Sequence, residues 1–165
     1  MKQFEQHHPV GSKARLALAL LLYTGVRRSD VLTFGRQHIK NNRLVLTQQK
    51  TKKQLVLPIL PQLQAILDAS PVGSLTFLVN EFGRPYSCQG FSNLFRMWCR
   101  QAGLKNRSPH GLRKLAATTL ANAGASSRML MSVFGWSSLH EAERYTRAAD
   151  QQQLAEQAMK LLEQN

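Results

Sequence analysis

The chain has 165 residues, the length of one domain, and its 43% of hydrophobic residues argues against disorder over most of that length. Twenty-two Lys and Arg side chains against nine Asp and Glu give a net charge of +13, which predicts a polyanionic partner: nucleic acid first, an anionic membrane surface second. Two cysteines, Cys88 and Cys99, exclude a disulfide framework and favour a reducing compartment.

Helical periodicity and capping residues predict that most of the chain is α-helical. In chain order, the expected helices cover residues 12–23, 26–34, 61–69, 87–102, 110–123, 126–134, 139–145 and 150–162. Residues 1–11 are polar and are expected to be a leader or the remnant of a linker, which leaves residues 12–165 as one domain.

Three β-rich runs interrupt the helical period. They cover residues 38–40, 43–47 and 54–59, and a Lys-rich turn at residues 48–53 joins the last two. The expected fold class is therefore mainly α with a small three-stranded antiparallel β-sheet. The apolar run at residues 16–22 is far shorter than the roughly 20 residues of a membrane-spanning helix. We therefore expect a soluble, cytoplasmic protein with no membrane partner.

The distribution of acidic residues bears on the chemistry. No Asp or Glu occurs between residues 82 and 140, a stretch that carries eight Lys or Arg. A metal-dependent nuclease needs several converging carboxylates to hold its divalent ions. We therefore expect no metal and no cofactor, and a phosphate chemistry that relies on cationic side chains.

The segment 109–113, Pro-His-Gly-Leu-Arg, opens a predicted helix. His110 and Arg113 are three residues apart and share one helix face. Free backbone N–H groups at a helix N-terminus favour anions, so the pair predicts a phosphate site. The alternative is a capping histidine beside an arginine that pairs with an acid, but no acid lies nearby in the sequence.

A second candidate anion site follows the Gly25 turn, which places Arg27 and Arg28 at the start of the next expected helix. An arginine can bind a phosphate through two parallel hydrogen bonds. Asp30, three residues after Arg27, is a candidate to brace it. The alternative is a surface salt bridge between Arg27 and Asp30 without a functional role.

Tyr145 is one of three tyrosines, and it lies between charged residues in the sequence Glu-Arg-Tyr-Thr-Arg. A core tyrosine would be unusual in this setting, which makes its hydroxyl a candidate for chemistry. The alternative is a half-exposed tyrosine with a structural role.

Together, these segments resemble the catalytic domain of the tyrosine recombinase (phage integrase) family over residues 14–149. The matching elements are an arginine box at Thr24-Gly25-Val26-Arg27 with Asp30, a β-hairpin lysine at Lys50, the His-x-x-Arg box at 110–113, Phe134-Gly135-Trp136, and Tyr145-Thr146. Relatives usually carry a helical core-binding domain before the catalytic domain. Residues 12–165 are therefore expected to be either an excised catalytic domain or an unusually short family member, and the sequence favours the first.

The resemblance implies a site-specific DNA recombinase that cleaves and rejoins strands without metal or ATP. Tyr145 is the implied nucleophile: it attacks a DNA phosphodiester and forms a 3′-phosphotyrosine, and a 5′-hydroxyl leaves. Arg27 and Arg113 are implied to neutralise the pentacoordinate phosphorane.

The resemblance assigns the proton transfers to two further residues. His110 is implied to assist proton transfer near the tyrosine, and Lys50 to protonate the leaving 5′-oxygen. Trp136 stands where most relatives have histidine. Its indole N–H can donate a hydrogen bond to a phosphate oxygen, but it cannot carry a proton.

Six other basic residues are candidates for contacts with the DNA backbone, with solvated surface charge as the alternative. They are Arg28, Lys52, Lys53, Lys105, Arg107 and Lys114. The implied partners are double-stranded DNA and other recombinase protomers in a synaptic tetramer on DNA, with the free domain monomeric.

The last expected helix carries a narrow apolar stripe, made of Leu154, Ala158, Leu161 and Leu162. From residue 141 to the end there are five acids against three Lys or Arg, which suits a protein contact better than a DNA contact. Relatives dock a C-terminal segment onto a neighbouring protomer. The alternative is that this helix packs on its own domain.

Other functions stay open on the sequence alone. A type IB topoisomerase would use a related site to relax DNA, and a non-catalytic prophage remnant would only bind it. All five family elements are filled, which argues against decay. A membrane binder would need a basic amphipathic helix, whereas the charge is spread, +7 in residues 1–82 and +6 in residues 83–165.

Overall fold

The computed structural model describes residues 1–147 and 151–163. The helices in this part of the chain are α1 (Lys2–His7), α2 (Lys13–Thr24), α3 (Arg28–Val31), α4 (Pro61–Asp68), α5 (Cys88–Gln101), α6 (Pro109–Asn122), α7 (Ser127–Phe134), α8 (Leu139–Thr146) and α9 (Gln151–Glu163), with a short 3₁₀ helix, η1 (Arg36–His38). The strands are β1 (Ile39–Lys40), β2 (Arg43–Thr47) and β3 (Gln54–Pro58). The expected fold class is confirmed.

Short polar side chains and glycines set the helix boundaries. At five N-termini a serine side chain accepts a hydrogen bond from a backbone N–H of the first turn; these serines are Ser12, Ser87, Ser108, Ser126 and Ser138. Gly25 and Gly135 adopt left-handed φ values of 62° and 66° and end α2 and α7. Both turns contribute to the site described below.

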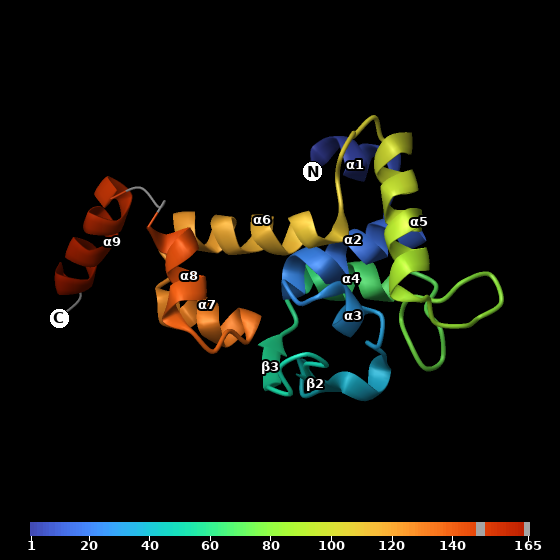
Figure 1. Ribbon diagram of the computed structural model, residues 1–165, viewed down its shortest axis with the longest axis horizontal. Helices are drawn as coiled ribbons and strands as arrows, with labels where there is room; N and C mark the ends of the chain where they lie inside the picture. Colours follow the sequence, from blue (N-terminus) through green and yellow to red (C-terminus); the bar gives the residue numbers. More distant parts are fainter. Residues whose placement is uncertain (148–150, 164–165) are drawn as a thin grey trace.

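Helix α2 is the centre of the core. Its Ala/Leu run is buried on nearly every face, and it packs against α4 on one side and α6 on the other. Helix α5 adds a row of buried aromatic side chains, Phe91, Phe95 and Trp98. A smaller apolar cluster joins α6, α7 and α8, which stand together at the opposite end of α6 from α5 (Figure 1).

The three strands form an antiparallel sheet in the order β1-β2-β3. Leu44 and Leu46 on β2 pair with Leu57 and Leu55 on β3, and all four are buried, as the alternation of the sequence predicts. The sheet therefore rests on the core by one face. The turn at residues 48–53 continues from it.

Residues 1–11 are not an extended segment. Helix α1 packs on α5. Its Phe4 ring is 2% exposed and lies 5.7 Å from the Phe95 ring, and His8 Nε2 donates to the Trp98 carbonyl at 3.0 Å. The polar composition of the segment did not indicate this packing, because a single phenylalanine makes most of the contact with α5.

One helix is shorter than expected. The helix predicted at residues 26–34 is only the four-residue α3, followed by η1. The last predicted helix is present as α9, and its expected first residue, Asp150, lies outside the described residues. No helix in residues 1–147 and 151–163 is long and apolar enough to cross a membrane.

Replacing Phe4 should show whether the first helix belongs to the folded domain. Phe4→Ala empties a core position, so it should lower the free energy of unfolding by about 3 kcal/mol in a urea titration followed by circular dichroism. Val10→Ala is the control, because Val10 is 53% exposed. Equal stability of the two variants would show that α1 is dispensable.

Candidate active site

One cavity of about 420 Å³ collects the predicted catalytic residues. They come from the residue that precedes α3, the turn between β2 and β3, α6, the α7–α8 connection and α8. The lining residues are Arg27, Lys50, His110, Arg113, Lys114, Trp136, Glu141, Arg144 and Tyr145. Segments up to 118 residues apart in the chain, from residue 27 to residue 145, thus meet in one place.

A second cavity, of about 490 Å³, shares three of these residues, Arg27, His110 and Arg113. Arg28 and Cys88 are among its other lining residues. The shared residues lie on the wall common to both cavities. The two together make a strongly basic depression, with Glu141 as the one carboxylate among their described lining residues.

Arg113 is the most buried cation of the site, with 7% of its surface exposed. Its guanidinium donates to the Gly25 carbonyl at 2.7 Å and to the Phe134 carbonyl at 2.9 Å. Burial, and next the charge of Arg27, lower the pKa of Arg113 to about 10. The group still carries its proton at neutral pH, and its neutral partners leave its charge uncancelled.

Arg27 directly precedes α3, held there by the Gly25 turn. Its Nη1 is buried and has no hydrogen-bond partner within the described part of the chain. A buried donor without an acceptor is unfavourable by about 1–3 kcal/mol. A phosphate oxygen in the cavity would satisfy it.

Asp30 does not brace Arg27 as expected, and no ion pair joins the two in the described residues. Asp30 is 1% exposed, and its Oδ1 accepts from the backbone N–H of Gln49 at 2.9 Å. It therefore ties α3 to the turn that bears Lys50. The Arg27 guanidinium is left for the cavity.

His110 stands at the second position of α6, beside four cations. The pKa of His110 is lowered below 6.5, and burial of the imidazole is the largest cause. The further causes, in decreasing order, are the positive charges of Lys114, Arg113, Arg28 and Arg27. The imidazole is therefore neutral at neutral pH. A neutral imidazole can accept a proton from a nearby hydroxyl.

A stack of three aromatic rings orients Tyr145. The Phe134 and Trp136 rings are 4.7 Å apart at 19°, and the Trp136 and Tyr145 rings are 5.3 Å apart at 8°. The Arg113 guanidinium lies over the same stack, 5.1 Å from the Phe134 ring and 5.6 Å from the Trp136 ring. Trp136 therefore contacts the Phe134 ring, the Tyr145 ring and the Arg113 guanidinium.

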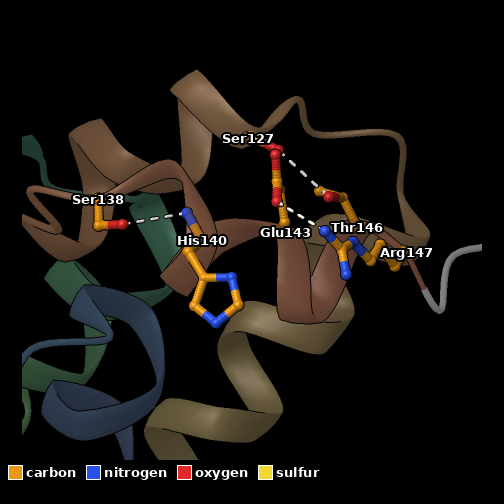
Figure 2. Close-up of polar contacts among 6 residues, drawn as sticks. All are labelled: Ser127, Ser138, His140, Glu143, Thr146 and Arg147. Carbon is orange, nitrogen blue, oxygen red and sulfur yellow. Dashed lines mark hydrogen bonds and ion pairs between the residues drawn. The ribbon is translucent and has the colours of Figure 1, made fainter.

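Helix α8, which carries Tyr145, is fixed at both ends (Figure 2). At its start, Ser138 Oγ accepts from the backbone N–H of His140 at 3.2 Å. At its end, the hydroxyl of Thr146 lies 3.2 Å from that of Ser127 on α7. Because Thr146 follows Tyr145 directly, this contact sets the rotation of the helix about its axis.

The candidate DNA-contact residues divide into two groups. Arg28 and Lys114 line the two cavities, and Lys52 and Lys53 lie exposed on the turn of Lys50. Lys105 and Arg107 lie in the α5–α6 loop and line neither site cavity. Arg107 lines a separate, mostly apolar cavity with Phe4 and Cys99.

Three residues at the site were not predicted from the sequence. Glu141 and Arg144 line the cavity beside Tyr145, and Glu141 is four residues before it on the same helix face. That spacing was the signal available in the sequence. The third, Gln48, is wholly buried next to Phe134 and gave no signal in the sequence.

The amino-acid sequence matches the phage integrase family over residues 1–152. The chain belongs to this family. The tyrosine recombinase XerD of Xanthomonas campestris pv. campestris is 31% identical in an alignment that covers 87% of this chain and 50% of that protein. The tyrosine recombinase XerC of Lactobacillus leichmannii is 29% identical, over 90% of this chain and 55% of that protein. This family member thus spans about half the length of its curated relatives.

Solved structures of the family share the fold. The crystal structure of XerA recombinase matches with a TM-score of 0.75 at 16% identity, over 96% of this chain and 60% of that one. A lambda integrase tetramer bound to a Holliday junction matches with a TM-score of 0.70 at 23% identity, over 85% of this chain and 46% of that one. The fold is that of a tyrosine recombinase catalytic domain.

The electrostatics of His110 can be measured directly. Lys114→Gln removes the largest charge that acts on the imidazole, so it should raise the pKa of His110 towards 6.5. The shift is read from the pH dependence of the His110 NMR signals in the free protein. Lys40→Gln, which removes a charge on β1 instead, is the control. A pKa of His110 above 6.5 in the unaltered protein would contradict the arrangement.

Proposed function

We propose that this chain cleaves and rejoins double-stranded DNA as the catalytic domain of a site-specific recombinase, through a covalent tyrosine intermediate. One observation carries the proposal: a single cavity holds Tyr145 together with Arg27, Arg113, His110 and Lys50. The names of the relatives support the reaction class.

The reaction begins with attack by the Tyr145 hydroxyl oxygen on the phosphorus of a DNA phosphodiester. The bond between phosphorus and the 5′-oxygen breaks, and the strand stays attached to Tyr145 through its 3′-phosphate. His110, neutral at rest, accepts the tyrosine proton, and Lys50 gives a proton to the leaving 5′-oxygen. Rejoining runs the same steps backward with a 5′-hydroxyl as the nucleophile.

The charge that develops on the phosphorane meets Arg27 and Arg113. Arg113 is held by two carbonyls and does not move to reach its place, which is the property that lowers a barrier electrostatically. Arg27 has a buried nitrogen free to bond a phosphate oxygen. In the described residues, no three His, Cys, Asp or Glu side chains gather as a metal site.

The partners follow from the reaction and from the charge. We place double-stranded DNA against the basic depression, with Arg28, Lys52, Lys53 and Lys114 on its backbone. Solved relatives include dimers and a tetramer bound to DNA. We extend that assembly to this chain, with the cytoplasm as its compartment.

A pool of duplexes with randomised sequence, each nicked so that the cut end diffuses away, tests the cleavage without a known target. The unaltered chain should form covalent adducts, and sequencing the attached strands identifies the site. Tyr145→Phe should form none, because it lacks the nucleophilic oxygen, while it keeps the ring stack and the DNA affinity.

The controls of this experiment separate the alternatives. Tyr86→Phe removes a hydroxyl from outside the cavity and should leave adduct formation unchanged. Adducts that persist in Tyr145→Phe would show that the nucleophile is misassigned. DNA binding without any adduct from the unaltered chain would favour a non-catalytic binding module, and relaxation of supercoils without strand exchange would favour the topoisomerase-like alternative.

The two arginines should each be required for cleavage. Arg27→Ala and Arg113→Ala should each slow adduct formation at least about 100-fold, because each removes a preorganised charge from the phosphorane. Arg36→Ala, on the exposed η1 helix, is the control. Circular dichroism confirms folding. Full activity in either site variant, or loss of wild-type activity in EDTA, would contradict cleavage by cationic side chains.

Helix α9 is proposed to carry a contact between protomers. It lies apart from the sheet and α5 in Figure 1, and Met159 and Leu162 on it are 60% and 68% exposed. Gln157 Nε2 donates to the Ala123 carbonyl at 3.3 Å, so the helix also rests on the end of α6. One short helix buries less than the roughly 1,200 Å² of a stable interface, so the free chain should be monomeric.

Deleting residues 151–165 should leave binding to a single site intact and weaken assembly of multimers on DNA, measured by gel mobility and light scattering. Leu162→Glu should have the same effect, because it places a charge on the apolar stripe. Lys160→Glu changes charge on the same helix without removing an apolar side chain and should assemble normally. A truncated chain that unfolds, or that assembles fully, would contradict the contact.

A further inference from the structure

The buried glutamine of the hairpin turn is the starting point. Gln48 is 0% exposed and follows the last residue of β2, two residues before Lys50. Its Nε2 donates to the Phe134 carbonyl at 3.1 Å, and its Oε1 accepts from Thr51 Oγ1 at 2.6 Å. A buried amide is stable only when such bonds are made. Both ends of this side chain are therefore fixed.

The acceptor of Gln48 is also the acceptor of Arg113. The Phe134 carbonyl receives Arg113 Nη2 at 2.9 Å and Gln48 Nε2 at 3.1 Å. Phe134 is the last residue of α7, and the carbonyls of a final turn lack partners inside the helix. One helix end thus binds the arginine and the hairpin together.

Gly135 makes room for this contact. A Cβ atom on Gly135 would lie 2.4 Å from Gln48 Oε1 and 2.8 Å from its Cδ, and the φ of 66° is itself unfavourable for other residues. Gly135 therefore has two structural roles. It terminates α7, and it leaves room for the Gln48 amide to bond the Phe134 carbonyl.

Backbone hydrogen bonds of Gln48 also close the turn at residues 48–53. Gln48 N–H donates to the Lys53 carbonyl at 2.8 Å, and Lys52 N–H donates to the Gln48 carbonyl at 2.9 Å. Lys53 Nζ donates to the Trp136 carbonyl at 3.1 Å, a second tie to the same segment. Lys50 is thus at the tip of a short turn whose base is anchored beside Arg113.

We propose that Gln48 is a positioning residue for Lys50. This inference rests on the proposed function, in which Lys50 protonates the leaving 5′-oxygen. Lysine has a long flexible side chain, so its backbone position decides which atoms its ammonium group reaches. By fixing the turn to the carbonyl that also holds Arg113, Gln48 sets the distance from the ammonium group to the phosphate bound by that arginine.

The test uses a duplex recovered from the randomised pool, made with either oxygen or sulfur at the bridging 5′ position of the scissile phosphate. A 5′-thiolate leaves without needing a proton, so this substrate bypasses Lys50. Gln48→Met keeps the volume and removes both hydrogen bonds. Because displacement by about 1 Å can cost about 100-fold in rate, Gln48→Met should slow cleavage of the oxygen substrate about 10- to 100-fold.

On the sulfur substrate, the cleavage rate of Gln48→Met should be within about threefold of that of the unaltered chain. This difference corresponds to less than about 1 kcal/mol in the activation barrier. Gln49→Met is the matched control. It is the same substitution one residue later, on an exposed side chain whose Nε2 donates to the Ser29 carbonyl. Gln49→Met should behave as the unaltered chain on both substrates.

Lys50→Ala, assayed in parallel, separates failure of the inference from failure of the proposed function. If the sulfur substrate restores the cleavage rate of Lys50→Ala but not that of Gln48→Met, the positioning role of Gln48 is overturned and the role of Lys50 as the acid stands. No rescue of Lys50→Ala would overturn its role as the acid, and the inference with it. In the double variant, Gln48→Met should add nothing to Lys50→Ala on the oxygen substrate, and an additive loss would contradict coupling.

Thr51→Val keeps the test decisive if Gln48→Met does not fold. It removes only the hydroxyl that holds Gln48 Oε1, at a half-buried position. It should slow the oxygen substrate by a smaller factor and spare the sulfur substrate. Equal slowing of both substrates by the folded variants, as judged by thermal unfolding, would show that Gln48 acts only in packing.

Discussion

The site depends on one buried cation held by neutral oxygens. The Arg113 guanidinium bonds the carbonyls of Gly25 and Phe134, the residues at the ends of α2 and α7. A buried charge normally requires an anion beside it, which would cancel the field it exerts. Carbonyl dipoles satisfy the N–H groups and leave the net charge in place, so a positive charge lines the cavity.

This arrangement constrains the two helix ends. A Cβ on Gly25 would lie 2.5 Å from the Phe134 ring, so the α2 turn and the end of α7 touch with no room for another side chain. The Phe134 ring then begins the stack that continues through Trp136 to Tyr145. Arg113 and Tyr145 are therefore positioned by the same few contacts, although they lie on α6 and α8.

The sequence could predict what depends on local patterning. Helix α2 follows from its Ser12 cap, its Ala/Leu run and Gly25, and the hairpin follows from alternating apolar residues on β2 and β3. The residues that the family elements single out line one cavity. The sequence could not predict contacts made across the fold: Phe4 in the core, Asp30 bonded to the turn instead of to Arg27, or Gln48 under Phe134. Those depend on which surfaces meet, and no periodicity encodes that.

The unpaired Nη1 of Arg27 has a consequence for the energetics of the free protein. A folded state with a buried donor unsatisfied, among other cations, is less stable than the same fold with an oxyanion in place. Any ligand that binds the native state and not the unfolded chain raises its melting temperature as its concentration rises. Binding of an oxyanion at Arg27 and the conformational stability of the domain are therefore thermodynamically linked.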